Sequence, residues 1–187
     1  MRLALAILLC AGAVRAEIAD SGPNGFTIKI VATMHRSPAD VYSRIVRVGD
    51  WWSSQHTYSG DPHNLSIDAR AGGCFCEKLP DGGSVQHMEV VSARPGKMLR
   101  MYGGLGPLQG IAAAGSMTFD LKQEQGGTRL EFSYYVAGYS PQGLVGWAGP
   151  VNEVVSMQIA RFKNYVETGN PAPQSAAQPK AEQPRSR

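Results

Sequence analysis

Apolar and polar residues alternate along much of the chain, and this pattern predicts a strand-rich domain with two helices. Residues 26–31 alternate with a period of two, which is typical of a strand with one apolar face. A helix follows, with Ser37 as its N-cap, Pro38 at its first position and Gly49 at its end. The order strand then helix therefore opens the predicted domain.

Further strands follow this helix with no second helix among them. Glycine, proline and aspartate stand between them at positions that favour tight turns. In the last two strands the alternation is clearest, which predicts a sheet with one buried face and one solvated face. The predicted strands cover residues 64–69, 74–79, 84–93, 97–102, 116–123 and 128–136.

A long amphipathic helix closes the domain. It is predicted to begin near Pro150 and to end at Thr168, before Gly169, and its apolar residues recur at helical spacing. The order of elements predicts an α+β fold in which a curved antiparallel sheet of about seven strands wraps around the C-terminal helix. A hollow between such a sheet and helix suits an apolar ligand.

Both ends of the chain differ in composition from residues 17–169, which we take as the folded domain. Residues 1–16 combine Arg2, a short apolar run and Ala16, a pattern that predicts a cleaved signal peptide. The run is too short to span a bilayer of roughly 30 Å, so we expect no stable membrane anchor after cleavage. Residues 170–187 are rich in proline and lack apolar periodicity, which predicts a disordered tail. The protein is therefore expected in the periplasm or outside the cell.

The charge of the predicted domain argues against nucleic acid as a partner. The whole chain carries +3, of which the signal contributes +2 and the tail +2, leaving −1 for residues 17–169. Binding of phosphates requires clustered lysine and arginine, which a near-neutral domain does not supply. The oligomeric state has no signal in the sequence.

Residues 51–88 hold most of the chemically versatile side chains, and Glu77 with His87 is the best candidate for a catalytic acid–base pair. Whether they meet depends on the register of the hairpin around residues 79–84. If odd positions pair with odd, Glu77 shares a face with His87; otherwise the nearby cysteines do. We favour the first register because it also groups the apolar residues Phe75, Leu79, Val85 and Val91. A purely structural hydrogen bond between the two side chains is the alternative to catalysis.

Cys74 and Cys76 lie two positions apart on one predicted strand. An ideal strand rise places them roughly 6.6 Å apart, near the upper limit for a disulfide, so we expect two reduced thiols. The alternative is a zinc or copper site completed by His56, His63 or His87, but the spacing matches no standard motif. We therefore expect no metal and no cofactor.

Three loops are candidates for the rim of a ligand cavity. Residues 138–149, with Trp147, are expected to form either a lid or a loop packed on the core. Leu105–Leu108 are expected to form a second apolar lip of the cavity. Residues 56–63 are expected to form a polar loop at its mouth. The aromatic and long apolar side chains expected to line the cavity are Trp51, Trp52, Phe75, Leu99, Met101, Met117, Phe119, Phe132, Tyr134 and Phe162.

These segments, in this order, resemble the SRPBCC or START-like superfamily, which has the helix-grip fold and includes polyketide cyclases and heat-shock ATPase activators. The segments that carry the resemblance are Ser37-Pro38-Ala39-Asp40-Val41-Tyr42, Trp51-Trp52, Gly72-Gly73, Asp81-Gly82-Gly83, Pro95-Gly96-Lys97-Met98-Leu99, Gly126-Gly127-Thr128-Arg129-Leu130 and Arg161-Phe162. The resemblance implies a scaffold that supports both binding and catalysis. The export signal departs from its usual cytosolic members and argues against a chaperone-cofactor role.

The sequence contains no nucleophile elbow, phosphate loop, dinucleotide fingerprint or zinc-protease motif. We therefore expect an exported protein that binds a small hydrophobic molecule such as a lipid, fatty acid, polyketide or aromatic compound. The alternative is a cyclase or dehydratase-like enzyme that uses Glu77 and His87 in the same cavity.

Overall fold

The computed structural model describes residues 14–172. Apart from residues 14–16, the predicted signal peptide lies outside the described residues. The predicted tail does so apart from residues 170–172. Both remain predictions.

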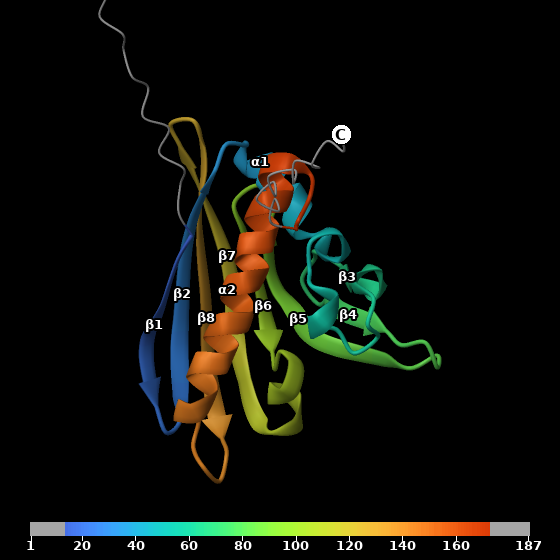
Figure 1. The fold of residues 1–187 in the computed structure, drawn as a ribbon, viewed down its shortest axis with the longest axis vertical. Coiled ribbons are helices and arrows are strands. Elements are labelled where there is room, and N and C mark those ends of the chain that lie inside the picture. Colours follow the sequence, from blue (N-terminus) through green and yellow to red (C-terminus); the bar gives the residue numbers. More distant parts are fainter. Residues whose placement is uncertain (1–13, 173–187) are drawn as a thin grey trace, which may run out of the picture.

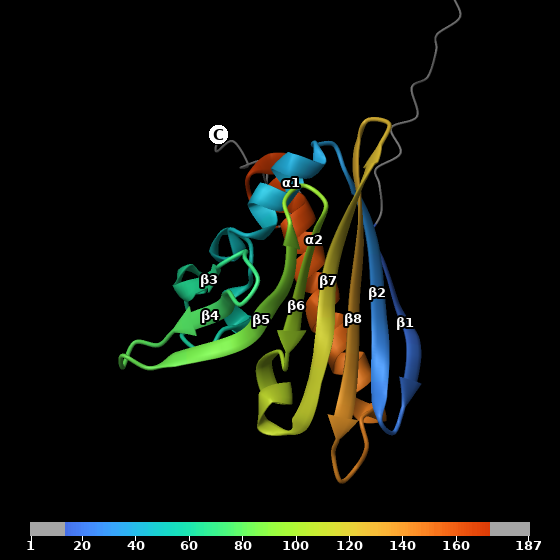
Figure 2. The same cartoon turned by 180° about the vertical axis from the view of Figure 1, so that it is seen from behind.

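One antiparallel sheet of eight strands wraps around a long helix within this part of the chain (Figures 1 and 2). The strand order is β1-β2-β8-β7-β6-β5-β4-β3. The long helix lies across β2, β8 and β7, whereas β5 bends away from it and carries β4 and β3 outward (Figure 1). The predicted α+β class and the predicted order of elements are confirmed. The bounds are β1 (Arg15–Gly22), β2 (Gly25–Met34), α1 (Pro38–Ile45), β3 (Leu65–Ile67), β4 (Cys74–Lys78), β5 (Ser84–Arg94), β6 (Met98–Gly103), β7 (Ala112–Glu124), β8 (Gly127–Tyr139) and α2 (Val145–Thr168).

Strand β1 was not predicted, and its burial explains why. It pairs with β2 along its length, but seven of its eight residues are exposed on both faces, so it carries no alternation of apolar and polar positions. Pairing of the backbone, rather than a buried face, holds this edge strand in place. A cut after Ala16 would leave Glu17–Gly22 of it.

Helix α2 begins at Val145, five residues before the predicted start, so Pro150 lies inside it. Proline removes one backbone donor from a helix, but the buried side chains of Leu144 and Ala148 hold this first turn against the core. The predicted loop 138–149 is correspondingly short, and Trp147 belongs to the helix. None of the helices within residues 14–172 is both long and apolar enough to cross a membrane.

The centre of the sheet and the apolar face of α2 belong to one buried core. Ile30, Phe132, Phe119 and Leu99 are consecutive register partners across β2, β8, β7 and β6, and all are buried. Ring contact between Phe119 and Phe132, at 5.1 Å between centroids, fills the middle of this row. The hollow predicted over the sheet centre is therefore occupied by the protein's own side chains.

The segment after α1 is fastened to α2 at several points. Trp51 packs on Phe162 with 5.0 Å between ring centroids, and its backbone oxygen accepts a hydrogen bond from Arg161 at 3.0 Å. The Tyr165 hydroxyl donates to Asp50 at 2.6 Å. These contacts fix the position from which residues 52–64 extend.

Replacing Phe162 by alanine should test this junction. Its side chain is fully buried, so Phe162→Ala should lower the free energy of unfolding by about 3–5 kcal/mol, because the cavity adds to the lost apolar burial. Chemical denaturation measures the loss. Glu153→Ala, on the exposed side of the same helix, should stay within about 0.5 kcal/mol, and an equal loss in both variants would contradict this packing.

Candidate binding and catalytic site

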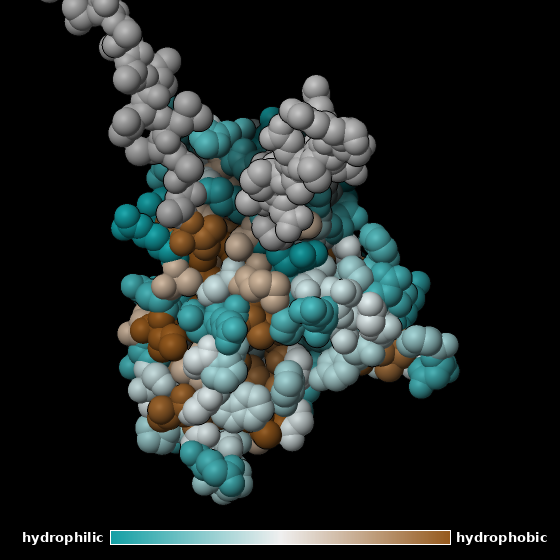
Figure 3. Space-filling model, viewed as in Figure 1, coloured by the Kyte–Doolittle hydropathy of each residue, from teal (hydrophilic) through white to brown (hydrophobic). Residues whose placement is uncertain are grey.

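A cavity of about 310 Å³ opens where β4 and β5 turn away from α2. Its walls come from residues 52–58, from β4 and β5, from the connection between β6 and β7, and from the first half of α2. Apolar side chains form a seam at the surface beside the lower half of α2 in the space-filling view (Figure 3). The lining residues are Trp52, Gln55, His56, Thr57, Tyr58, Phe75, His87, Leu105, Gly106, Pro107, Leu108, Trp147, Pro150, Val151, Val154 and Val155.

His87 is a buried polar residue in the cavity wall, and it lies at a β-bulge. Phe75 pairs with Met88 and Cys76 pairs with Gln86, so His87 is an extra residue in β5. A bulge breaks the strict alternation of faces, and here it turns His87 and Met88, two consecutive residues, both inward. On the turn side of the bulge Glu77 pairs with Val85, which is the odd-with-odd register that we favoured.

The bulge also corrects one predicted neighbour. Beyond it the inward positions of β5 are even-numbered, and a second irregularity lies between Val90 and Ser92. Val90 is therefore buried and Val91 is exposed. Val91 does not join Phe75 on the inner face, contrary to the prediction.

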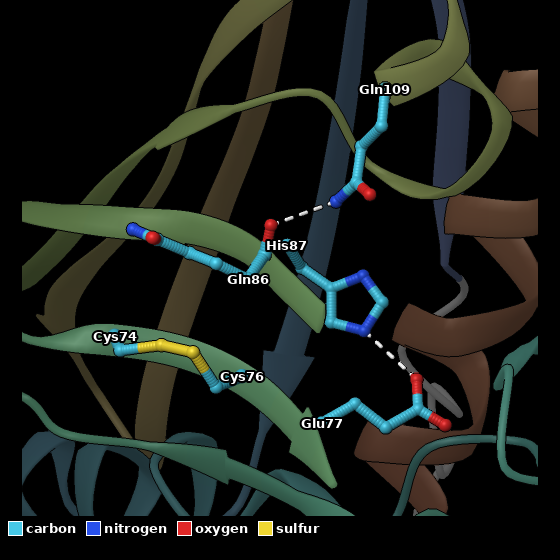
Figure 4. The surroundings of a disulfide bond; sticks show 6 residues. All are labelled: Cys74, Cys76, Glu77, Gln86, His87 and Gln109. Atoms are coloured by element: carbon cyan, nitrogen blue, oxygen red, sulfur yellow. Dashed lines mark hydrogen bonds and ion pairs between the residues drawn. A yellow bond between two sulfur atoms is a disulfide. The ribbon is translucent and has the colours of Figure 1, made fainter. Parts of the chain in front are cut away.

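Glu77 and His87 form a direct hydrogen bond in the interior. His87 Nε2 lies 3.0 Å from Glu77 Oε2, and the exposed fractions of the two side chains are 5% and 0% (Figure 4). The other carboxylate oxygen, Oε1, accepts a hydrogen bond from the Ser59 backbone N–H. Burial raises the pKa of the Glu77 carboxyl, but the hydrogen bonds from Ser59, Tyr58 and His87 outweigh it, so this pKa lies below its ordinary value.

His87 is neutral beside this carboxylate. Burial lowers the pKa of its imidazole, and the hydrogen bond and charge of Glu77 oppose that effect only in part. A neutral imidazole that donates to Glu77 carries its single proton on Nε2, which leaves Nδ1 as an acceptor. Nδ1 is buried and has no hydrogen-bond partner among the described residues. Figure 4 shows it turned away from Glu77, toward the segment that carries Gln109.

Two aromatic rings fix the orientation of the imidazole. Phe75 packs against it with 5.0 Å between ring centroids, and Tyr58 stacks on it at 5.9 Å with an interplanar angle of 20°. Tyr58 is half exposed, so its ring stands between His87 and solvent at the cavity mouth. The arrangement gives a mostly apolar cavity with a buried hydrogen-bond acceptor, His87 Nδ1, fixed in its wall.

Only two of the ten predicted cavity residues, Trp52 and Phe75, line this space. Their rings meet edge to face at 5.8 Å. The other eight are buried in the core or under α2 and are absent from the cavity wall, because α2 packs directly on the sheet centre. Those eight are Trp51, Leu99, Met101, Met117, Phe119, Phe132, Tyr134 and Phe162.

The predicted rim agrees better with the structure. Leu105–Leu108 form one wall, Trp147 contributes from the first turns of α2, and residues 55–58 contribute from the polar mouth. A hydrogen bond of 2.8 Å from Gln109 to the Gln86 backbone oxygen holds the first of these walls against β5 (Figure 4). Val151, Val154 and Val155 also line the cavity and were not among the predicted lining residues. The adjacent apolar pair 154–155 widens the apolar stripe of α2 and was the available signal.

Cys74 and Cys76 form a disulfide, which corrects the expectation of two reduced thiols. Their Cα atoms lie 5.4 Å apart, because β4 is contracted opposite the bulge in β5 and does not have the ideal strand rise. The bond occupies the thiols that the alternative metal site required. Within residues 14–172, no group of three or more histidine, cysteine or acidic side chains is placed to hold a metal ion.

Comparison with known proteins identifies the fold. No family model and no curated protein matches the chain. A conserved protein of unknown function from Enterococcus faecalis is similar in structure, with a TM-score of 0.58 and 18% identity over 88% of this chain and 81% of the other. CalU16 from Micromonospora echinospora gives a TM-score of 0.56 at 17% identity, covering 88% of each chain. The Aha1 dimer from Colwellia psychrerythraea gives 0.54 at 16% identity, covering 76% of this chain and 97% of that one. This likeness establishes the helix-grip fold.

Protonation of His87 should make stability depend on pH. An unfolded histidine has a pKa of about 6.5 and folded His87 has a lower one, so the unfolded chain binds more protons between the two values. The free energy of unfolding should therefore fall as the pH drops below about 6.5. The contribution of Glu77 should be lost at still lower pH, as the pH falls through its depressed folded pKa.

Denaturant titrations between pH 4.5 and 7.5 measure this dependence. His87→Gln keeps a donor for Glu77 but does not titrate, so its stability should be flatter with pH around pH 6 than that of the wild type. Parallel curves for the two proteins would show that His87 carries no shifted pKa.

Proposed function

We propose that this protein is an exported member of the SRPBCC or START-like superfamily that binds a small, mostly apolar molecule bearing one neutral hydrogen-bond donor. The observation that carries the proposal is the buried, unpartnered Nδ1 of His87 in the wall of a mostly apolar cavity. A buried acceptor without a partner costs free energy that a ligand donor would recover.

The size and charge of the cavity narrow the ligand class. Its volume of about 310 Å³ is at the lower end of the range for ligand sites, and a cavity of about 150 Å³ already holds benzene. One or two fused rings therefore fit better than a long acyl chain. The negative charge on Glu77, behind His87, disfavours a carboxylate at this corner and favours a phenol or alcohol.

The disulfide supports the location. Disulfides persist in oxidising compartments such as the periplasm and the extracellular space, and the apolar N-terminal run predicts export to one of them.

Two probes of matched shape test the binding mode. 2-Naphthol carries a hydroxyl donor, whereas 2-methoxynaphthalene has the same rings and no donor. Wild-type protein should bind 2-naphthol about tenfold more tightly, the value of one net hydrogen bond of about 1.4 kcal/mol. Titration followed by naphthyl fluorescence gives both dissociation constants.

His87→Phe should abolish this preference while 2-methoxynaphthalene still binds, because a phenyl ring has no acceptor. Circular dichroism checks that the variant folds, since Glu77 Oε2 loses its partner in it. Val154→Phe should lower the affinity for both probes, because the larger side chain fills part of the cavity. Equal affinity of the wild type for both probes, or a preference that survives in His87→Phe, would overturn the proposal.

A second function, general-base catalysis, is favoured by the same hydrogen bond. A carboxylate that orients a neutral imidazole leaves Nδ1 able to accept a proton from an apolar substrate, as a cyclase or dehydratase would require.

5-Nitrobenzisoxazole, an apolar molecule that opens when a base removes its ring C–H proton, is a suitable probe of this second function. Its opening should be faster with wild-type protein than with His87→Phe at pH 7. Equal rates in the two proteins, with the probe bound, would eliminate His87 as a base.

A further inference from the structure

The Cys74–Cys76 disulfide lies directly opposite the bulge that presents His87. The two cysteines bracket Phe75, and the extra residue of β5 stands against the step from Phe75 to Cys76. Glu77 is the next residue of the same strand. One covalent bond therefore lies beside Phe75, which lines the cavity, and Glu77, which holds the lining residue His87 in place.

The bond also holds β4 in a contracted form. Two strand steps span about 6.6 Å in an extended strand, but the Cα atoms of Cys74 and Cys76 are 5.4 Å apart. The contracted step of β4 lies opposite the extra residue of β5, so both departures from ideal strand geometry occur at the same place in the hairpin. A β4 freed from the bond would be able to take the extended form, in which Glu77 would lie farther along the strand relative to His87.

The position of the bond makes it reachable by an external thiol. Phe75 and Glu77 are buried on the inner face, whereas Cys74 and Cys76 alternate with them and are only partly buried. A disulfide that closes so short a loop gains little from restricting the unfolded chain. The third cysteine, Cys10, lies in the predicted signal peptide, so the processed chain would contain no competing thiol.

We propose that Cys74–Cys76 is a reversible redox site that accepts two electrons from a dithiol, and that its oxidation state sets the alignment of His87 with Glu77. A thiolate of the dithiol attacks one sulfur of the bond, the S–S bond breaks, and a mixed disulfide forms. The second thiol of the dithiol then attacks the reagent's own sulfur in this mixed disulfide and releases the cysteine as a thiol. Both cysteines end as protonated thiols and the dithiol ends as a disulfide. This assignment deepens the proposed function by giving the same corner of the cavity a redox control.

Dithiothreitol and the full chain suffice for the test. Thiol counting should show that the folded protein gains two thiols in excess dithiothreitol. Nitrogen-15 spectra of the histidine rings should show His87 in the single Nε2–H tautomer when the protein is oxidised, and in averaged tautomers when it is reduced. The spectra need no ligand, so this readout stands even if naphthol binding fails. His35, which contacts Glu167 near the end of α2, should keep its signal.

The naphthol preference gives the second readout. The roughly tenfold preference for 2-naphthol over 2-methoxynaphthalene should fall toward onefold on reduction and return on reoxidation. The double variant Cys74→Ser and Cys76→Ser should match the reduced protein and ignore dithiothreitol.

Three results would overturn the redox assignment. The first is a bond that resists excess dithiothreitol in the folded protein. The second is a His87 tautomer that is the same in both oxidation states. The third is loss of the near-ultraviolet circular-dichroism signal on reduction, which would show that the bond is needed for the fold and is not a reversible redox site.

Discussion

The buried carboxylate of Glu77 is the constraint on which the site depends. An ionised group with no exposed surface is costly unless its oxygens are hydrogen-bonded, and two distant parts of the chain meet that requirement. Ser59 brings the mouth loop onto one oxygen, and His87 occupies the other. Because the single imidazole proton of His87 is on Nε2 and is donated to Glu77, Nδ1 remains an acceptor at the cavity wall. The chemistry of the site thus follows from the need to satisfy one buried charge.

The cavity exists because the sheet follows α2 over only part of its width. The row from Ile30 to Leu99 is buried in the same core as the apolar face of the helix. Beyond it, the bulges of β5 turn this strand and β4 away from α2, and the valines of the helix face the resulting opening. The first of these bulges lies at His87, so the acceptor stands at the point where the sheet turns away from α2.

Much of the fold could be predicted because a strand with one buried face shows an alternation of apolar and polar residues in the sequence. β1 could not, since it is exposed on both sides and is held by backbone pairing alone. The Glu77–His87 contact was accessible because it depended only on the parity of one hairpin. The disulfide and the exposure of Val91 were not, because both follow from departures from ideal strand geometry that periodicity does not encode. Most of the predicted cavity residues point inward as expected, but alternation does not tell an inward residue that meets α2 from one that meets empty space.

A crystal structure of the oxidised protein with 2-naphthol tests the central claim most directly. The account predicts the rings between Phe75, Leu108 and Val154, with the hydroxyl within hydrogen-bond distance of His87 Nδ1 and the Glu77 contact retained. Rings bound elsewhere on the protein, or a hydroxyl turned toward solvent with Nδ1 still unpartnered, would contradict it.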